Sequence, residues 1–236
     1  MTVTPVTEVT ALRIARQQRT RAQALVVGGL ALLVAVLWVA SLMIGERFYG
    51  LDEVWQVIIG KQVPGASFTV GELRLPRATL ALLAGLAFGS AGVTFQTLLR
   101  NQLASPDIIG ISAGASAAGV IGIVILKLSD TTVSLLALAA AIGTALAIYA
   151  LSYKGGFAGT RLILIGIGIS SMLGAVVTYT LSLASSWDLQ TATRWLTGSL
   201  NNSSWSRVAP LAVTCAVVLP LMWLNSGKLA AMRFGD

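Results

Sequence analysis

The sequence contains no histidine and only one cysteine, Cys215. These absences exclude an intrachain disulfide and a zinc site of the usual histidine and cysteine type. Charge is scarce as well: charged residues make up 11% of the 236 positions, whereas hydrophobic residues make up 56%. A soluble domain carries about a quarter charged residues. The excess apolar surface is therefore expected to face lipid.

Charged side chains are missing from six long apolar runs, each near the length of about 20 residues that crosses a bilayer as a helix. The runs cover residues 24–45, 78–99, 108–126, 131–153, 162–187 and 208–227. The first run is too long for the apolar core of a signal peptide, so we interpret it as a span. We predict an all-α integral membrane protein in which residues 1–236 form one transmembrane domain with six transmembrane helices.

The distribution of charge predicts the orientation. With the N-terminal tail (about residues 1–23) in the cytoplasm, the inner segments carry nine Lys and Arg against three acidic residues. The outer segments carry seven against six. The positive-inside rule therefore places both ends in the cytoplasm, chiefly because of Arg13, Arg16, Arg19 and Arg21.

The six runs also lack any acidic or basic side chain that could couple transport to an ion gradient near the bilayer midplane. A phosphate-binding P-loop is absent too, since Gly60-Lys61 and Gly227-Lys228 are followed by Gln62 and Leu229 rather than Ser or Thr. The chain is therefore not expected to be an enzyme, and we expect energy for transport to come from a partner.

Arg74 and Arg77 are the most informative polar residues. Pro76 is predicted to open the second span, which puts Arg77 at a helix N-terminus, where the macrodipole disfavours a cation. Both arginines also fall on the outer side, against the positive-inside bias. Two interpretations stay open: the pair docks an acidic partner protein through bidentate contacts, or it anchors the helix at lipid phosphates.

Two further features lie in the connections. Residues 100–107 are predicted to form a tight cytoplasmic turn, with Asn101 in the left-handed cap conformation and Ser105-Pro106 opening the next helix. Trp187, Trp195 and Trp205 bracket an outer loop, where they form either an aromatic belt or part of a short amphipathic helix over residues 188–195.

Small residues recur at four-residue spacing in three of the runs, which is typical of helix faces that pack closely in lipid. The predicted packing positions include Gly85, Gly89, Gly110, Gly114, Gly166 and Gly174.

Several motifs in order resemble one family. They are Arg74-Leu75-Pro76-Arg77, Gly85, Gly89, Gln96, Arg100-Asn101, Leu103-Ala104-Ser105-Pro106, Gly110 and Gly114-Ala115, continued by residues 161–168 and 195–201. This pattern resembles the permease subunits of iron-siderophore and vitamin B12 ABC importers, and within them the ferric-enterobactin type. The resemblance runs from about residue 24 to the end.

The resemblance implies a permease in the cytoplasmic (inner) membrane with no cofactor, no metal site of its own and no role for nucleic acid. Its partners are a second permease, identical or homologous, cytoplasmic ATP-binding subunits and an extracytoplasmic binding protein. Arg74 and Arg77 become the binding-protein docking pair. The cytoplasmic gate falls at Asn101, Leu103, Gly159 and Thr160.

The sequence departs from the family in two places. Gln102 stands where a proline is usual, and the chain ends at residues 234–236, where the coupling helix of a ten-span permease should begin. We therefore expect a fragment or a truncated product, and we expect that this polypeptide by itself does not couple to its ATPase. A ferric catecholate is the expected cargo, with hydroxamate chelates, haem and cobalamin as alternatives. A secondary carrier and a non-transporting scaffold are the rival functions.

Overall fold

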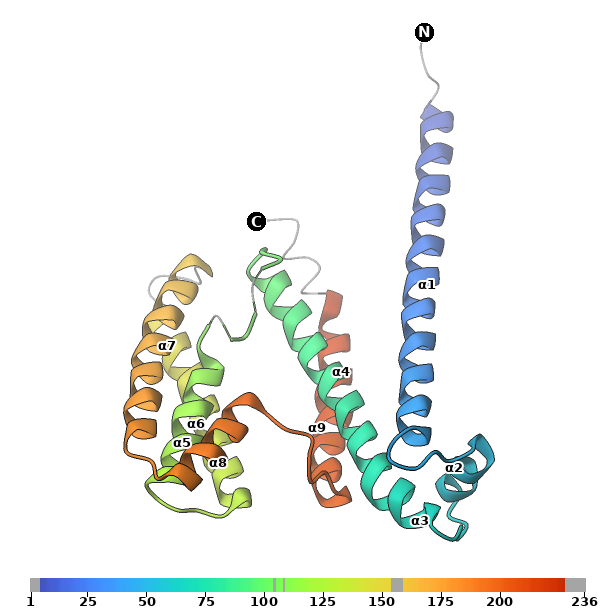
Figure 1. The fold of residues 1–236 in the computed structure, drawn as a ribbon. Coiled ribbons are helices and arrows are strands. Elements are labelled where there is room, and N and C mark those ends of the chain that lie inside the picture. Colours follow the sequence, from blue (N-terminus) through green and yellow to red (C-terminus); the bar gives the residue numbers. More distant parts are fainter. Residues whose placement is uncertain (1–4, 104, 108, 154–158, 228–236) are drawn as a thin grey trace. The chain divides into compact units, whose positions relative to one another are not determined.

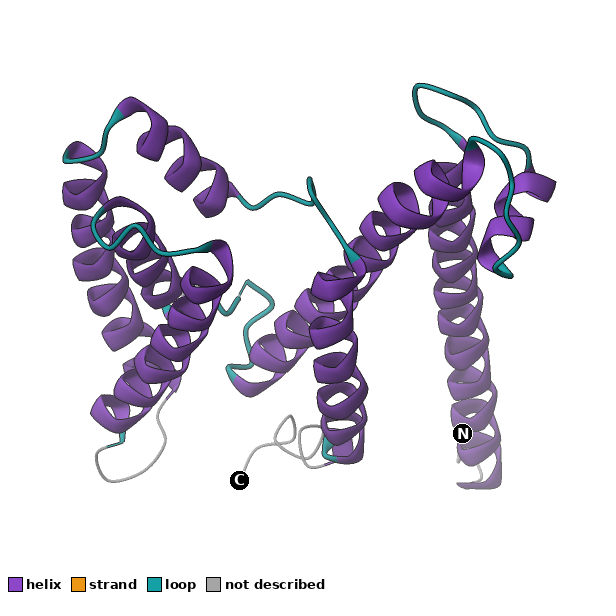
Figure 2. Cartoon of the chain, turned by 90° about the horizontal axis from the view of Figure 1, so that it is seen from below, coloured by secondary structure: helices purple, strands orange, loops and turns teal. Residues whose placement is uncertain are grey.

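The computed structural model describes residues 5–103, 105–107, 109–153 and 159–227. Within these residues every regular element is helical (Figures 1 and 2). The helices are α1 (Pro5–Met43), α2 (Leu51–Ile58), α3 (Ala66–Phe68), η1 (Thr69–Arg74), α4 (Leu75–Leu98), α5 (Ile111–Val124), α6 (Asp130–Ser152), α7 (Gly159–Ser182), α8 (Ser186–Thr197) and α9 (Trp205–Leu224). The element η1 is one π-helical turn inside the continuous helix Ala66–Leu98.

Five helical segments of the described chain are long and apolar enough to cross a membrane. They are Ile14–Met43, Ala66–Leu98, Asp130–Ser152, Gly159–Ser182 and Trp205–Leu224. Lipid offers the backbone no hydrogen-bond partners, so such segments must form helices that satisfy their own amides. The predicted class, an all-α membrane protein, is confirmed.

The third expected run, 108–126, contains a shorter helix than predicted. α5 has 14 residues, which extend about 21 Å and therefore fall short of a bilayer of about 30 Å. The residues before it form turns rather than helix. The expected first residue of this run, Ile108, lies outside the described residues, as do Ala104 and the C-terminal positions 228–236.

The described chain divides into two compact units, and the division falls within α4. Unit 1 comprises residues 1–82 and 202–208, and unit 2 comprises residues 83–201 and 209–236. In unit 1 the end of α1, the helices α2 and α3, the π-turn and the start of α4 share one apolar cluster. Its buried members are Leu42, Tyr49, Val54, Ala66, Val70 and Ala78. We call residues 42–78 the Arg74 corner.

Unit 2 is built around α5, which contacts α6, α7 and α8 (Figure 1). Six of its residues are buried, and three of them are glycines: Gly114, Gly119 and Gly122. At its far end Val120 and Val124 pack with Ala192 of α8. Surrounding helices thus shield the short helix and the two residues directly before it, Ile109 and Gly110, which is the condition under which non-helical backbone is tolerated at membrane depth.

Candidate functional site

The guanidinium of Arg74 is held by backbone carbonyls at the end of α1. Its Nη1 donates to the carbonyl oxygens of Leu42 and Met43, at 2.9 and 3.0 Å, and its Nη2 donates to that of Arg47 at 2.7 Å. The last carbonyls of a helix have no partner within the helix. Arg74 therefore caps the C-terminus of α1, from a position 27 to 32 residues further along the chain.

Tyr49 and Gly45 lie next to the Arg74 guanidinium. The guanidinium carbon of Arg74 also lies 5.1 Å from the centre of the Tyr49 ring, in a cation–π arrangement. The Tyr49 hydroxyl in turn donates to the carbonyl of Gly65 at 2.7 Å. At Gly45 a Cβ would stand 2.8 Å from the Arg74 guanidinium carbon, so the arginine occupies the space that a larger residue would need.

Arg77 differs from Arg74 because its side chain is exposed. The sequence-based argument for it needs a correction. Pro76 does not open the helix, since the helical run begins ten residues earlier at Ala66. A proline inside a helix clashes with the carbonyl four residues before it, here Glu72, and the π-turn Thr69–Arg74 widens the helix at that place. Arg77 is thus not at a helix N-terminus and carries no macrodipole penalty.

We call residues 99–110, which connect α4 to α5, the Gly110 turn. At the end of α4 the left-handed conformation is taken by Arg100, with φ +51°, and not by Asn101 as predicted. Asn101 uses its side chain instead: Oδ1 accepts the Leu103 amide at 2.9 Å, an Asx turn that ties down the loop. Leu103 is 83% exposed, a large fraction for an apolar side chain.

The predicted start of the next helix is also wrong. Ser105 and Pro106 lie in the loop, and α5 begins at Ile111 with Gly110 as its N-cap, at φ +91°. The Ser112 hydroxyl donates to the carboxylate of Asp107, so this acidic side chain does lie beside the N-terminus of α5. The helix begins late because Ile109 and Gly110 press against α7.

That contact is between backbones. A Cβ at Gly110 would lie 2.9 Å from the carbonyl oxygen of Gly166, and a Cβ at Gly166 would lie 2.9 Å from the carbonyl carbon of Ile109. Real Cβ atoms do not approach other atoms so closely, so both positions require glycine. A Cβ at Gly114 would likewise lie 2.8 Å from the Cβ of Thr144 and 3.0 Å from the carbonyl oxygen of Ala140, both in α6.

The remaining glycines of the predicted packing set behave differently. A Cβ at Gly85, Gly89 or Gly174 meets no neighbouring atom of the described chain within 4 Å. Their role in helix packing stays a prediction.

The two segments predicted to form the cytoplasmic gate lie at the same end of unit 2. Gly159 begins α7, and a Cβ there would lie 3.3 Å from Cδ2 of Leu99, which directly precedes the Gly110 turn. Thr160 is exposed, as are Asn101 and Leu103. The structure therefore brings the two segments near one another through Leu99, with polar and apolar side chains left uncovered around that contact.

The loop predicted to lie outside, residues 185–207, contains the amphipathic helix that was one of two interpretations. α8 covers Ser186–Thr197, and the Trp195 ring lies against Gly119 of α5. Lys127 forms an ion pair with Asp188, which also accepts from the Ser185 hydroxyl. The Lys127 and Ser185 hydrogen bonds hold the pKa of the Asp188 carboxyl below its usual value. Together these contacts fix α8 across the end of α5.

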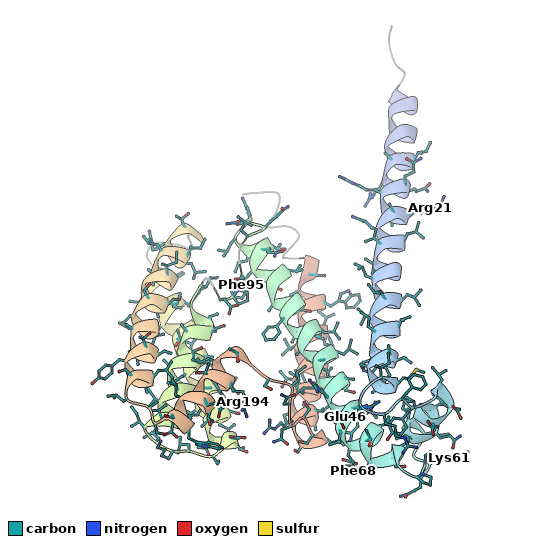
Figure 3. All side chains as sticks on the ribbon, in the orientation of Figure 1. Arg21, Glu46, Lys61, Phe68, Phe95 and Arg194 are labelled. Carbon is teal, nitrogen blue, oxygen red and sulfur yellow. The ribbon has the colours of Figure 1, made fainter. Side chains whose placement is uncertain are left out.

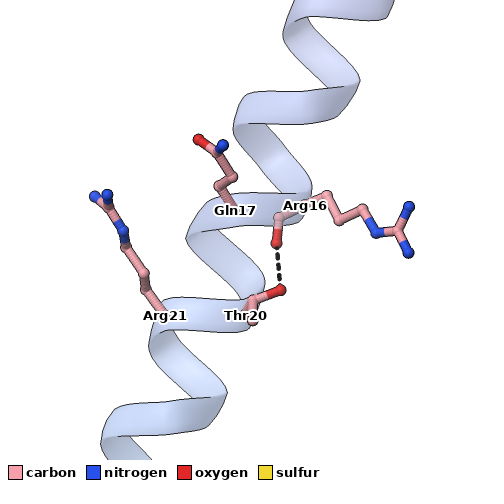
Figure 4. Close-up of a pocket in the computed structure, with 4 residues that line it drawn as sticks. All are labelled: Arg16, Gln17, Thr20 and Arg21. Atoms are coloured by element: carbon pink, nitrogen blue, oxygen red, sulfur yellow. Dashed lines mark hydrogen bonds between the residues drawn. The ribbon is translucent and has the colours of Figure 1, made fainter.

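The described residues contain no group of three or more His, Cys, Asp or Glu side chains suited to hold a metal ion. A shallow hollow on α1 is lined by Arg16, Gln17, Thr20 and Arg21 (Figure 4). All four are exposed and belong to one helix, in which the Thr20 hydroxyl donates to the Arg16 carbonyl at 2.9 Å. This basic surface has no enclosing wall among the described residues.

Several apolar helices of membrane length define the class of this chain, a multi-pass integral membrane protein. Residues 32–236 match the model of the FecCD transport family. The chain belongs to the FecCD transport family.

Individual relatives agree with this assignment. The chain is 37% identical over 208 residues to the achromobactin transport system permease protein CbrC of Dickeya dadantii, covering 87% of this chain and 59% of the relative. It is 34% identical over 206 residues to the ferric enterobactin transport system permease protein FepG of Escherichia coli, covering 87% and 62%. The chain thus spans about three fifths of the length of these curated relatives.

A solved structure shows the same fold. It is described as an inward-facing conformation of a putative metal-chelate type ABC transporter, and it matches with a TM-score of 0.70 at 25% identity. The match covers 88% of this chain and 67% of that chain.

Proposed function

We propose that this chain is a permease subunit of a binding-protein-dependent ABC importer, and that it forms part of the path by which a ferric siderophore enters the cytoplasm. The observation that carries the proposal is the family match over residues 32–236, joined to relatives whose names specify achromobactin, ferric enterobactin and iron(3+)-hydroxamate. A chelate crosses with its iron already bound by the organic ligand. The absence of a metal-ligand cluster among the described residues is compatible with such a cargo.

The proposal includes the topology and the partners. Both ends lie in the cytoplasm, and the membrane is the cytoplasmic one, in accord with the basic N-terminal segment. A second permease, identical or homologous, completes the path. ATP hydrolysis takes place in separate cytoplasmic subunits, which drive transport by binding one permease conformation more tightly than the other.

Docking of the extracytoplasmic binding protein is proposed at Arg77. Its exposed guanidinium is available for a bidentate contact with a carboxylate. Arg74, three of whose five N–H donors bind carbonyls, holds the corner on which Arg77 stands. The original pair thus divides into one residue that binds and one that positions.

Charge reversal at Arg77 tests its proposed role in docking. The full chain is tested with its partner subunits in nanodiscs. Arg77→Glu is expected to weaken the affinity for the binding protein by about 3 kcal/mol, roughly a hundredfold, because like charges then face each other. Arg77→Gln, which loses the contact without repulsion, should weaken it less. An unchanged dissociation constant for Arg77→Glu would rule out docking at this residue.

The gate is proposed at the Gly110 turn and the start of α7, with Asn101, Leu103, Gly159 and Thr160 as its residues. The support is the Leu99–Gly159 contact, which joins the segments at one end of unit 2. In a Cys215→Ser background, cysteines at positions 103 and 160 should cross-link to an extent that changes when ATP is added. A yield independent of ATP would contradict gating at this contact.

The decisive test of function is uptake by spheroplasts, in which the cytoplasmic membrane is the only barrier. Cells lacking the gene should lose uptake of iron-55 supplied as one of three probes: ferric enterobactin, a ferric hydroxamate or ferric citrate. Cobalt-labelled cobalamin serves as the cargo control, and loss of cobalamin uptake alone would replace the siderophore proposal. Uptake that a protonophore abolishes while ATP stays high would indicate a secondary carrier. Normal uptake of every probe would indicate a scaffold.

A further inference from the structure

The short helix α2 leaves one apolar face uncovered. Leu51, Trp55 and Ile58 follow the spacing i, i+4 and i+7, which places them on one side of a helix. They are 62%, 62% and 39% exposed. Phe48, just before the helix, is 65% exposed. Such a contiguous row of large apolar side chains is costly in water.

Rotation of α2 about its own axis cannot bury this face. On its other apolar side Val54 is 3% exposed and belongs to the core of the Arg74 corner, where Val57 packs as well. The start of α2 is also fixed, since the Gly50 amide donates to the carboxylate of Glu53 at 2.8 Å. A third side carries the exposed polar residues Asp52 and Gln56. The uncovered face is therefore a permanent feature of the fold.

The uncovered face continues the lipid-facing surface of α1. A shallow groove of about 410 Å³ is lined by apolar side chains only, five from α1 and one from α2: Ala35, Val36, Val39, Ala40, Met43 and Leu51. The membrane-length segment of α1 ends at Met43. Leu51 thus lies beside the last turns of a span, at the depth where hydrocarbon gives way to headgroups.

The charges around α2 are three acidic residues, Glu46, Asp52 and Glu53, and two cations, Arg47 and Lys61. The first charged residues after α1 are Glu46 and Arg47, and Lys61 follows α2 at its other end (Figure 3). Arg47 and Lys61 are both exposed. Cations that flank an apolar helix face attract the phosphates of a bilayer, whereas tryptophan is enriched at the boundary between headgroups and acyl chains.

We propose that α2 is an interfacial helix, which lies in the headgroup region of the lipid leaflet next to the end of α1 and inserts Leu51, Trp55 and Ile58 among the acyl chains. The helix anchors the Arg74 corner to the bilayer surface. This inference depends only on the membrane location of α1, so it holds whatever solute the protein carries.

The single cysteine allows a direct test. In a Cys215→Ser background, a spin label is placed on the full chain either at Trp55→Cys, on the uncovered face, or at Gln56→Cys, the matched control on the polar side. The chain is reconstituted in nanodiscs of phosphatidylethanolamine and phosphatidylglycerol. Collision with oxygen, which concentrates in lipid, is compared with collision with a water-soluble nickel chelate.

The ratio of oxygen to nickel collisions is expected to be several-fold higher at position 55 than at position 56. Equal ratios would place both labels in water and overturn the proposal. Protection of position 55 from both reagents would also overturn it, because a protein surface rather than lipid would then cover the face. Leu51→Cys paired with Asp52→Cys repeats the comparison one turn earlier, should the tryptophan replacement fail to fold.

Discussion

The Arg74 corner and the Gly110 turn both hold irregular backbone beside a long apolar helix, by opposite means. In the Arg74 corner, side chains donate to backbone carbonyls: Arg74 donates to three, and the Trp205 indole donates to that of Gly71 at 3.1 Å. In the Gly110 turn, the lack of side chains at Gly110 and Gly166 lets two backbones touch. The first region should therefore be sensitive to lost donors, and the second to added carbon atoms.

The largest effect is expected at Arg74. Arg74→Ala removes the donor to the carbonyls of Leu42 and Arg47 and one of the two donors to that of Met43, which also accepts the Tyr49 amide, and should lower the free energy of unfolding by about 3 kcal/mol. Titration with SDS in mixed micelles measures it. Arg77→Ala is the control, since its exposed side chain should contribute less than about 0.5 kcal/mol. Equal losses in both variants would remove the distinction between the two arginines.

The next effect is expected at Gly166. Gly166→Ala forces the new Cβ against the backbone of Ile109, which cannot move aside as a flexible side chain can, and should cost about 2 kcal/mol. Gly168→Ala is the matched control on the same helix, because a Cβ there meets no neighbour within 4 Å. Melting temperatures in detergent report both. An unchanged melting temperature for Gly166→Ala would show that the backbone of the Gly110 turn can move aside for the added Cβ.

A smaller loss is expected at Trp205. Trp205→Phe keeps a large aromatic ring but removes the indole N–H that the Gly71 carbonyl accepts within the π-turn. One such bond is worth about 1 kcal/mol. The variant should lose this amount in the SDS titration, and Trp223→Phe, at a 75% exposed side chain, should lose nothing measurable.

The smallest effect concerns Asp188, outside both regions. Its pKa is lowered in the folded protein, chiefly by the Lys127 hydrogen bond, so its contribution to stability is present above the unfolded pKa and is lost as the pH falls through the folded value. The melting temperature of the wild type should therefore drop slightly more than that of Asp188→Asn between ~pH 6 and ~pH 3. Parallel curves would contradict a stabilising ion pair.

Composition alone predicted the fold class, since apolar runs in lipid can only become helices. A helix over residues 188–195 was one of two interpretations of the tryptophans around it, and the structure has a helix there, α8. These features depend on local sequence, which one chain displays in full.

The details of both irregular regions depended on distant contacts. Asn101 was expected to adopt the left-handed conformation, yet its side chain accepts the Leu103 amide while Arg100 takes the positive φ. The cap predicted at Ser105-Pro106 follows local rules, but α5 begins only after the contact with Gly166. The partners of Arg74 are backbone carbonyls, which every residue has, so no sequence pattern marks them.

One consequence follows from the way Arg74 is bound. Its charge is not neutralised by carbonyls, but three of its five N–H donors are used, so toward an approaching acidic surface it acts mainly through the long-range field. That field fades over about 8 Å at physiological ionic strength. Arg77 retains its donors for short-range contact. Under the docking proposal, added salt should slow the encounter of the two proteins far more than it loosens the complex once formed.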